Sequence, residues 1–378
     1  MKIVIAMDSF KGTLSSLEAG NIIKTAFLEV FPNADTEVVS VADGGEGTVD
    51  AILQNMGGER RNLRVTGPLG KAVDAAYGIA DDVAVVEMAA ASGLPLLEQV
   101  EYDPLHATTY GTGELIKAAL DAGAKKIIVG LGGSATNDAG AGMAQALGAS
   151  FVDADGKEAA FGGINLRDVC SVQISEMDDR LSGCEVIGAC DVTNPLCGEQ
   201  GASHVYGPQK GADIHDVKAL DMSLKHFSEV VKQETGIDKE KQAGAGAAGG
   251  LGYGLMTFCG AQLSPGIDIV LDLAGFDERV KDADIVVTGE GRIDAQTING
   301  KTPVGVAGRA KTHGVSVAAI GGQLGDGYER VYQAGIDTVF SCVDRIIDEN
   351  DIAAGAKKRL YATAYNAAKA IRTGQKIK

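Results

Sequence analysis

A glycine-rich turn between a predicted strand and a predicted helix is the stretch best suited to bind an anion. Residues 125–147, KKIIVGLGGSATNDAGAGMAQAL, begin with a β-branched apolar run and pass through glycines into an alanine-rich helical pattern. Glycines let a ligand come close to the backbone, and free N–H groups at a helix start attract an anion such as a phosphate. For this stretch alone, an ordinary turn with an Asn or Asp cap explains the pattern equally well.

Charged residues follow the first predicted strand in the same way. Asp8 and Lys11 come after the apolar run at 2–7 and before a helical pattern. A carboxylate at the end of a strand suits a metal or a substrate hydroxyl, and a lysine suits an anionic oxygen. The alternative is structural: Ser15 or Ser16 caps the helix while Asp8 and Lys11 face water.

The second predicted strand, at 36–41, is followed by two acids. Asp43 and Glu46 enclose a Gly-Gly pair, and another helical pattern follows up to Met56. A metal site or a hydroxyl-binding site explains two acids beside a flexible turn. A capping box, with Asp43 as the cap and Glu46 reaching back, also explains the acids but leaves the glycines unexplained.

Further candidates follow a predicted strand at 185–189. Asp191 and Asn194 precede Pro195, and a residue before proline is held in an extended conformation. Such a carboxylate and amide suit a metal or a proton transfer. Lys210 is a candidate to neutralise a transferring group, although most lysines face solvent.

A fourth group of charges follows the predicted strand at 284–288. This group comprises Glu290, Arg292, Asp294 and Lys301, close to Gly289, Gly291 and Gly300. The triplet Gly300-Lys301-Thr302 resembles the end of a phosphate-binding P-loop, but position 295 is Ala where that motif requires Gly. Pro303 suits the first turn of a following helix. We therefore predict a site here that is not a Walker A sequence.

A second glycine motif does not indicate a dinucleotide-binding fold. Residues 243–254, AGAGAAGGLGYG, contain G-x-G-x-x-G, but the preceding residues KQETGIDKEKQ are polar and charged instead of forming a strand. We expect a glycine-lined helix start that packs closely against a neighbouring segment or a nucleotide.

Composition excludes several classes of protein. The net charge of −17 argues against nucleic acid or an anionic membrane as a partner. An anionic ligand must then be bound locally by backbone N–H groups, a few Lys or Arg, and a divalent cation. The 52 glycines among 378 residues are about twice the usual share, which favours many tight turns and close approaches to ligands.

The cysteines and the apolar runs predict a cytoplasmic protein. The six cysteines contain no C-x-x-C pair, the five histidines contain no H-E-x-x-H motif, and structural zinc is not expected. The first strand begins at Lys2 without a signal-peptide pattern before it, and no apolar run reaches the length that spans a membrane. We expect the thiols to be reduced.

The order of predicted elements indicates two α/β domains. Residues 1–62 and 284–378 alternate strand and helix, whereas residues 63–283 combine a Gly-Pro-rich hairpin with βα units. We predict a Rossmann-like parallel-sheet domain built from both chain ends and an inserted α/β domain with a mixed sheet. Ligands bind beyond the carboxyl ends of parallel strands. The active site is accordingly expected in the cleft between the two domains.

Several motifs together resemble the type I glycerate kinase family. They are DSFKGTLS from Asp8, ADGGEGT from Ala42, GLGGSATNDAGAG from Gly130, CDVTNPL from Cys190, VYGPQKGA from Val205, GAGAAGGLG from Gly244 and TGEGRIDAQTINGKTP from Thr288. The resemblance extends over nearly the whole chain, with small changes such as Ala139. It implies a two-domain α/β kinase, unrelated to P-loop kinases, that transfers the γ-phosphoryl group of MgATP to D-glycerate in glyoxylate and sugar-acid catabolism. The expected product is 2-phosphoglycerate.

The chemistry of phosphoryl transfer, which needs positioning and neutralisation of charge, assigns expected roles to these residues. Asp191 is the first choice for the base that accepts the hydroxyl proton, and Asp8 is the second. The candidates are Asp191, Asp8, Lys11 and Lys210 for catalysis; Asp43, Glu46, Arg64, Arg292 and Lys301 for substrate binding; Gly132, Gly133, Ser134, Asn137, Gly289 and Glu290 for ATP; and Asp138, Asp191 and Asn194 for the metal.

The expected cofactors and partners follow from the same assignment. They are ATP, Mg²⁺ and a small acid, with no nucleic acid and no membrane, and with a homodimer as the oligomer considered. Two other functions stay open: a kinase of another small hydroxy or sugar acid, and a non-catalytic sensor of an acidic metabolite. The density of acids beside anion-binding turns counts against a sensor, since a sensor needs neither metal nor base.

Overall fold

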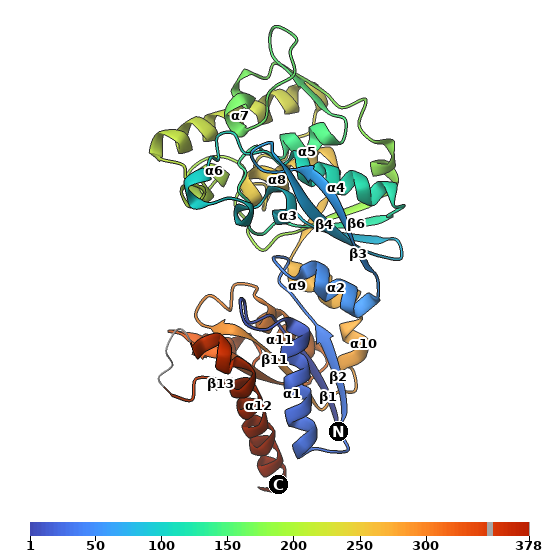
Figure 1. Cartoon of the computed structure of the whole chain (residues 1–378), viewed down its shortest axis with the longest axis vertical. Helices are drawn as coiled ribbons and strands as arrows, with labels where there is room; N and C mark the ends of the chain where they lie inside the picture. Colours follow the sequence, from blue (N-terminus) through green and yellow to red (C-terminus); the bar gives the residue numbers. More distant parts are fainter. Residues whose placement is uncertain (346–350, 378) are drawn as a thin grey trace. The chain divides into compact units, whose positions relative to one another are not determined.

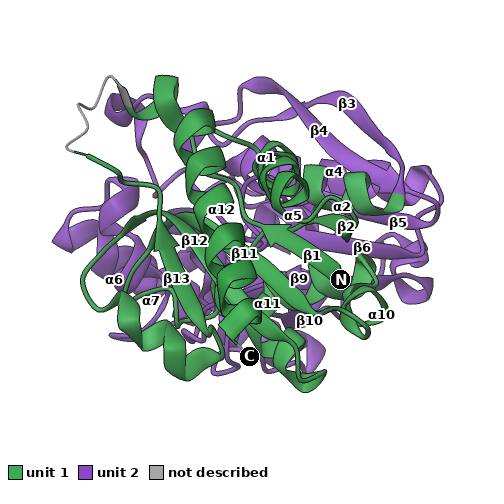
Figure 2. Cartoon of the chain, turned by 90° about the horizontal axis from the view of Figure 1, so that it is seen from below, with its two compact units in different colours: residues 1–43, 50–56, 265–378 green, residues 44–49, 57–264 purple. Residues whose placement is uncertain are grey.

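The computed structural model describes residues 1–345 and 351–377 (Figure 1). The chain divides into two compact units, coloured separately in Figure 2. Unit 1 comprises Met1–Asp43, Asp50–Met56 and Pro265–Lys378, and unit 2 comprises Gly44–Val49 and Gly57–Ser264. The domains expected from sequence, 1–62 with 284–378 and 63–283, are divided at other residues and remain a prediction.

Unit 1 contains a five-stranded parallel sheet built from both ends of the chain, as predicted. The strand order is β13-β12-β11-β1-β2. Buried apolar runs form its centre, and Ile3, Val4 and Ile5 of β1 are fully buried. The strands are β1 (Lys2–Met7), β2 (Asp35–Ser40), β11 (Ile285–Ile293), β12 (Ser316–Leu324) and β13 (Thr338–Ser341).

Strand β11 is longer than the sequence pattern indicates. We expected a turn after Thr288, but the strand continues through the glycines to Ile293 because Glu290 and Arg292 stay in register with Gly321 and Gln323 of β12. The side chains of residues 289–293 are therefore held on a strand of the sheet instead of a free loop.

The helices of unit 1 cover the faces of this sheet. Helix α1 packs beside α12, and Ser15 caps α1 through a capping box with Glu18. Pro303 lies in the first turn of α11, as predicted. The helices are α1 (Ser16–Val30), α9 (Gly266–Leu273), α10 (Phe276–Val280), α11 (Thr302–Thr312) and α12 (Asp351–Ile377), together with the unit 1 part of α2 (Thr48–Met56) and the 3₁₀ helix η6 (Tyr328–Ala334).

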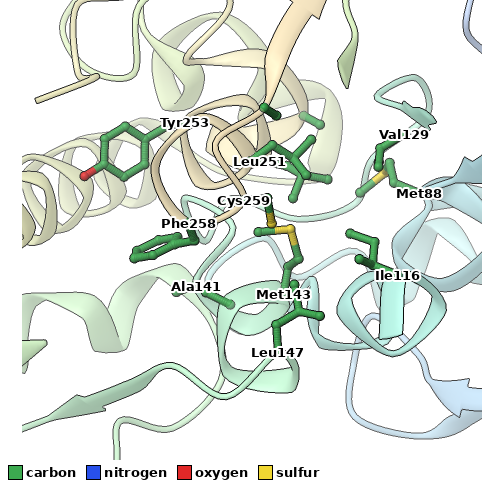
Figure 3. Packing of buried hydrophobic residues seen from close by; sticks show 14 of the residues in the cluster. Met88, Ile116, Val129, Ala141, Met143, Leu147, Leu251, Tyr253, Phe258 and Cys259 are labelled. Carbon is green, nitrogen blue, oxygen red and sulfur yellow. The ribbon is translucent and has the colours of Figure 1, made fainter. Parts of the chain in front are cut away.

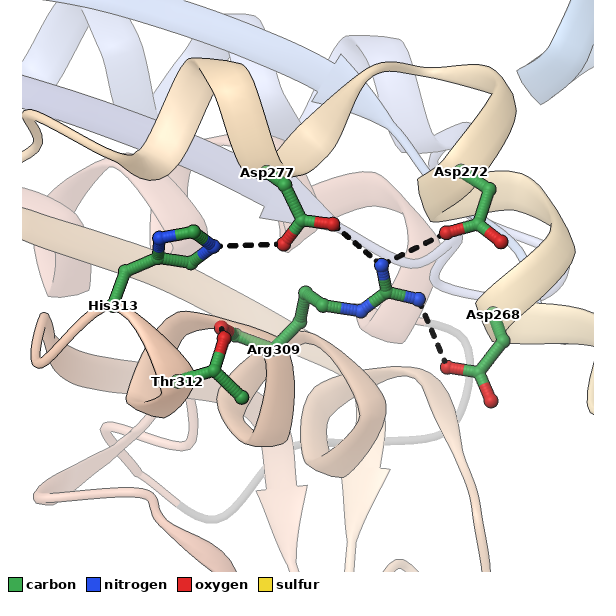
Figure 4. Close-up of polar contacts among 6 residues, drawn as sticks. All are labelled: Asp268, Asp272, Asp277, Arg309, Thr312 and His313. Carbon is green, nitrogen blue, oxygen red and sulfur yellow. Dashed lines mark hydrogen bonds and ion pairs between the residues drawn. The ribbon is translucent and has the colours of Figure 1, made fainter.

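An ion-pair network joins α11 to the two preceding helices (Figure 4). The guanidinium group of Arg309 lies 2.8 Å from Asp272 Oδ1, 2.6 Å from Asp277 Oδ2 and 3.5 Å from Asp268 Oδ1. The ring of His313 lies 2.9 Å from the other oxygen of Asp277. This network fixes the orientation of α11, whose first turn reaches the candidate site described below.

Unit 2 contains a six-stranded mixed sheet, also as predicted. Its order is β10-β9-β6-β5-β4-β3; the strands from β5 to β10 are parallel, and β3, β4 and β5 are joined by antiparallel pairing. The strands are β3 (Glu59–Thr66), β4 (Ala72–Ala80), β5 (Val83–Glu87), β6 (Lys126–Gly130), β9 (Glu185–Ala189) and β10 (Gln262–Ser264), with a separate antiparallel pair of β7 (Ser150–Val152) and β8 (Ser171–Gln173).

The core of unit 2 joins its helices to the sheet (Figure 3). Val129 of β6, Met143 of α5 and Leu251 of α8 are buried together in one apolar cluster. The helices are α3 (Ala89–Ser92), α4 (Tyr110–Asp121), α5 (Ala141–Ala146), α6 (Ala202–Tyr206), α7 (Ile214–Thr235), α8 (Ala247–Phe258) and the 3₁₀ helices η1 (Leu94–Leu96), η2 (Gln99–Glu101), η3 (Gly163–Asp168), η4 (Asp179–Gly183) and η5 (Pro208–Lys210).

The helix expected at 105–122 begins at Tyr110 instead. Residues before it form a loop, because the backbone N–H and the hydroxyl of Thr109 are both bonded to the Asp138 carboxylate. All six cysteines are free. In the part of the chain that the structure describes, none of the helices combines the length and apolar character needed to cross a membrane.

Candidate functional site

A cavity of about 850 Å³ lies at the carboxyl edge of the unit 1 sheet. The strand order reverses between β1 and β11, because the chain proceeds from β1 to β2 on one side and from β11 to β13 on the other. Open parallel sheets bind ligands at such a switch point. Six of the predicted site residues line this cavity: Asp8, Lys11, Asp43, Glu290, Arg292 and Lys301.

Asp8 is held directly after β1 by two hydrogen bonds. The backbone N–H of Ser9 donates to Oδ1 at 2.6 Å, and the hydroxyl of Thr302 donates to Oδ2 at 2.7 Å. The side chain is 6% exposed. Burial raises the pKa of Asp8 to about 6, although the Thr302 hydrogen bond opposes the rise. Asp8 is therefore a buried carboxyl that titrates close to neutral pH.

Glu290 is the second buried carboxyl of the cavity. Its Oε1 accepts a hydrogen bond of 2.7 Å from Thr297, and its Oε2 lies 3.7 Å from the ammonium nitrogen of Lys301. Burial raises the pKa of Glu290 to about 7, against the opposing effects of Thr297 and Lys301. Two adjacent strands thus position two buried acids whose pKa values are raised, that of Asp8 to about 6 and that of Glu290 to about 7.

Cationic side chains surround these acids. Lys11 is exposed, and Arg292 is largely exposed with its Nε 2.9 Å from Asp294 Oδ2. Lys301 precedes the first turn of α11 and faces Glu290. The combination of buried acids and exposed cations suits a small anionic molecule whose hydroxyl must lose a proton.

Gly289 is required by packing within the sheet. A Cβ atom there would lie 1.9 Å from the carbonyl oxygen of Ile320 and 2.7 Å from the methyl group of Met7. Close strand packing therefore accounts for this glycine. Its expected contact with ATP remains a prediction.

The capping alternatives have different outcomes. Ser15 caps α1 as the structural alternative proposed, but Asp8 is buried instead of facing water. The capping box of Asp43 and Glu46 is not formed, since Gly47 occupies the N-cap of α2 without a side-chain hydrogen bond. Asp43 lines the unit 1 cavity, whereas Glu46 is exposed in unit 2.

In unit 2, a buried lysine holds the glycine-rich turn that follows β6. The ammonium group of Lys210 donates to Ser134 Oγ at 2.8 Å and to the carbonyl oxygen of Thr136 at 2.7 Å. Lys210 is only 1% exposed, and burial lowers its pKa to about 7. The expectation that most lysines face solvent is wrong for this residue, which lies inside the unit.

Two polar residues of the turn are engaged in internal bonds. Oδ2 of Asp138 accepts hydrogen bonds from the backbone N–H and the hydroxyl of Thr109 and from the N–H of Gly142, and Oδ1 accepts one from the N–H of Gly140. Burial raises the pKa of Asp138. The Asn137 amide nitrogen donates to Ser203 Oγ at 2.9 Å, and its buried oxygen has no hydrogen-bond partner. The structure thus gives Asp138 a role in shaping the turn. Its expected contact with a metal stays a prediction.

The glycines of the turn divide between an open face and a packed face. Gly132 and Gly133 are exposed, so their backbone is accessible to a ligand. The opposite face packs against the start of α8, where a Cβ on Gly249 would lie 1.9 Å from the carbonyl oxygen of Thr136. The element directly before α8 is helix α7 and not a strand, so the context that a dinucleotide fingerprint requires is missing, as predicted.

The remaining predicted residues lie elsewhere in unit 2. Asp191 is exposed directly after β9. The amide of Asn194 donates to the carbonyl oxygen of Gln200 and accepts a 2.7 Å hydrogen bond from the hydroxyl of Tyr206. Arg64 is exposed on β3, opposite Asp74 in the register.

The side chains that could hold a metal are few in the described part of the chain. Within residues 1–345 and 351–377, no group of three or more His, Cys, Asp or Glu side chains is arranged to hold a metal ion. Mg²⁺ commonly uses one or two carboxylates together with substrate phosphates. Of the three expected ligands, Asp191 has an exposed side chain, Asp138 is buried and accepts hydrogen bonds from Thr109, and Asn194 accepts one from Tyr206.

Sequence reasoning missed the hydroxyl groups that hold the acids. Thr302 and Thr297 are fully buried, and each donates to one carboxylate of the cavity. The signal for Thr302 was its place at a helix start in the Gly-Lys-Thr triplet. Gln323 also lines the cavity, and its position on β12 beside Arg292 became visible only through the extended strand.

The chain belongs to the glycerate kinase family, whose sequence pattern matches residues 3–372. It is 50% identical over 347 residues to a glycerate kinase of Halalkalibacterium halodurans, with 91% of each chain covered. It is 48% identical over 378 residues to the glycerate 2-kinase of Escherichia coli, covering 100% of this chain and 99% of the relative.

A solved structure shares the fold over the whole length. It is the crystal structure of a protein provisionally called glycerate kinase 2 from Salmonella typhimurium LT2, with a TM-score of 0.91 and 48% identity. The match covers 100% of this chain and 99% of the other chain. The two-sheet α/β architecture described above is therefore that of a glycerate kinase relative.

Proposed function

We propose that the chain is an ATP-dependent glycerate kinase that phosphorylates a hydroxyl group of D-glycerate. The observation that supports this most directly is the unit 1 cavity, where the buried carboxyl of Asp8 lies at the sheet's switch point among cationic side chains. Glycerate 2-kinase is the name of the Escherichia coli relative. We accordingly propose 2-phosphoglycerate as the product.

The cavity supplies the groups that a small hydroxy acid needs. Lys11, Arg292 and Lys301 line it and can bind the carboxylate of glycerate or the moving phosphoryl group. Asp43, also in the lining, can accept a hydrogen bond from a substrate hydroxyl. A molecule with both a carboxylate and hydroxyl groups matches this mixture of charges.

Asp8 is suited to accept the proton of the reacting hydroxyl. Its position is fixed by hydrogen bonds to both oxygens, and a pKa of about 6 leaves it mostly ionised at neutral pH while still able to take a proton. Asp191, the first choice from sequence, is exposed in unit 2. We therefore propose Asp8 as the base and retain Asp191 as the alternative.

The glycine-rich turn of unit 2 is proposed to bind the ATP phosphates. Its exposed residues, Gly132 and Gly133, offer backbone N–H groups, and Lys210 holds the turn from inside through Ser134. Asp191, with Asn194 and Asp138 as further candidates, would hold the Mg²⁺ of MgATP. When bound, that ion neutralises part of the charge of the phosphates.

The test is release of ADP from MgATP with D-glycerate, compared with L-glycerate and with added EDTA. Enolase added to the product then distinguishes the two positions of phosphorylation, since only 2-phosphoglycerate is consumed at once. Turnover that requires D-glycerate and metal is expected. A product that enolase does not consume would move the proposal to 3-phosphoglycerate, and no ADP release with any glycerate would overturn it.

Two alternatives are decided by the same assay. Turnover with another small hydroxy or sugar acid in place of D-glycerate would indicate a related kinase. Binding of MgATP without turnover on any acid would indicate a sensor. A cytoplasmic location and a homodimer complete the proposal; the dimer is tested by light scattering of the purified protein.

A further inference from the structure

We propose that the segment following β11, residues 294–302, positions the two buried carboxylates of the unit 1 cavity, with Thr302 holding Asp8 and Thr297 holding Glu290. This inference rests on the proposed function, in which Asp8 acts on the substrate hydroxyl. It gives the Gly300-Lys301-Thr302 triplet a role other than the phosphate binding that its sequence resembles.

Thr302 is placed to fix one particular oxygen of Asp8. It is the first residue of α11, it is fully buried, and its hydroxyl donates to Oδ2 at 2.7 Å. The other oxygen accepts from the N–H of Ser9 at 2.6 Å. Because each carboxylate oxygen can accept two hydrogen bonds, one acceptor position remains on each oxygen for a substrate hydroxyl. The carboxylate is therefore oriented without being saturated.

Thr297 holds Glu290 with a defined hydroxyl direction. Its Oγ1 accepts a 3.1 Å hydrogen bond from the backbone N–H of Asp294 and donates at 2.7 Å to Oε1 of Glu290. The accepting bond directs the hydroxyl proton towards the acid. Lys301 of the same segment lies 3.7 Å from the second oxygen of Glu290.

The lysine and threonine of the triplet each lie beside an acid of the cavity. In a P-loop, the corresponding lysine reaches phosphate oxygens and the hydroxyl binds Mg²⁺. Here Lys301 faces Glu290, and Thr302 donates to Asp8. The N-terminus of α11, where Thr302 lies, adds a partial positive charge that also favours an ionised Asp8.

The expected consequence of removing the Thr302 hydroxyl is a change in the pH at which Asp8 ionises. The charged groups that face Asp8 are Asp43 and Glu290, which oppose its ionisation, and Lys11, which favours it. The Thr302 hydroxyl donates to the ionised form, so its removal raises the pKa of Asp8 above about 6. A base that must be ionised then loses activity at acid and neutral pH and recovers it at alkaline pH.

The experiment compares Thr302→Val, Thr302→Ser and the wild type by the pH dependence of kcat/KM for D-glycerate. In the pH profile of kcat/KM, the acid limb is the part where activity rises with pH as Asp8 ionises. Thr302→Val is expected to shift the inflection of this limb about one pH unit higher, which is a roughly tenfold loss of kcat/KM below the inflection. Its activity should approach that of the wild type near pH 9, and Thr302→Ser should restore the original profile. Thr302→Ala replaces the Val variant if that variant does not fold.

The matched control is Thr297→Val, which removes a hydroxyl from the same segment without touching Asp8. It is expected to leave the acid limb attributed to Asp8 without an upward shift. Loss of activity in Thr302→Val that is equal at every pH would show only a structural role and would overturn the inference. An unshifted acid limb would overturn it as well.

A second readout does not depend on the activity. The carboxyl carbon of Asp8 is titrated by NMR in protein labelled at Asp, with its signal assigned by its absence in Asp8→Asn. The wild-type midpoint should be about 6 and should rise in Thr302→Val. A raised midpoint in a protein that does not phosphorylate glycerate would support the positioning role while rejecting the proposed function. An unchanged midpoint would reject the positioning role.

Discussion

The ammonium nitrogen of Lys210 lies 2.8 Å from the hydroxyl oxygen of Ser134, within the buried interior of unit 2. The same nitrogen donates to the carbonyl oxygen of Thr136, so Lys210 holds both Ser134 and Thr136 of the glycine-rich turn in place. The side chain is too deeply buried to meet a ligand at the surface. We therefore propose that Lys210 acts on the turn, and on a phosphate bound there only through the turn.

Replacing Lys210 by Met should raise the KM for ATP by roughly 30-fold, because two buried hydrogen bonds worth about 1 kcal/mol each no longer fix the turn. The KM for glycerate should change little. Steady-state kinetics at varied ATP measures the effect. Lys218→Met, an exposed lysine on α7, is the matched control and should leave both constants unchanged. An unaltered KM for ATP in Lys210→Met would contradict the role.

Gly249→Ala should destabilise the protein more strongly than Gly260→Ala. Both residues have positive φ values, 68° and 63°, so both substitutions incur the left-handed backbone penalty of about 1–2 kcal/mol. Only the new Cβ at Gly249 meets another atom, the carbonyl oxygen of Thr136 at 1.9 Å, whereas Gly260 has nothing within 4 Å. Denaturant unfolding of both variants measures the difference, and equal losses of stability would refute the packing argument.

Asp8→Asn and Asp191→Asn separate the two candidate bases. The variant that lacks the base should lose roughly 10²- to 10⁴-fold in kcat with the KM for glycerate little changed, since proton acceptance matters in the transition state. We expect that loss in Asp8→Asn. A larger loss in Asp191→Asn, with near-normal kcat in Asp8→Asn, would return the role to the residue chosen from sequence.

Glu290→Gln should be more stable relative to the wild type at pH 8 than at pH 5. The pKa of Glu290 is raised from 4.5 to about 7, so the wild type loses stability as pH rises through this window while glutamine does not. The free energy of unfolding of Glu290→Gln, relative to that of the wild type, should be about 1–3 kcal/mol higher at pH 8 than at pH 5. Thermal unfolding at both pH values measures it, with the exposed Glu278→Gln as the control that should show no such pH dependence.

Much of the fold was predictable because its central strands are apolar runs between polar turns. The bounds of β1 and β9 agree with the predicted runs at 2–7 and 185–189. The predicted strand at 284–288 ended too early because Gly289 and Gly291 are typical of turns. In the structure, pairing with β12 keeps both glycines extended within β11. A local pattern cannot show such a partner, which lies 31 residues farther along the chain.

The candidate site was partly predictable for a similar reason. Acids and cations at the ends of β1 and β11 could be expected to meet, because parallel strands bring their carboxyl ends to one edge of a sheet. The burial of Lys210 could not be expected, since its partners Ser134 and Thr136 lie more than 70 residues earlier. The same holds for the hydroxyl of Thr302, which meets an aspartate 294 residues away.

The pairing of Ile3 in β1 with Ile285 in β11 also constrains how the chain folds as it is synthesised. Strand β1 leaves the ribosome long before β11, whereas residues 57–264 contain every strand of the unit 2 sheet. Until β11 is made, β1 can pair only with β2, and its other edge stays open. Contacts between such distant residues form slowly, and an open edge of an apolar strand is prone to aggregation meanwhile. The unit 1 sheet is therefore completed only after every strand of the unit 2 sheet has been synthesised.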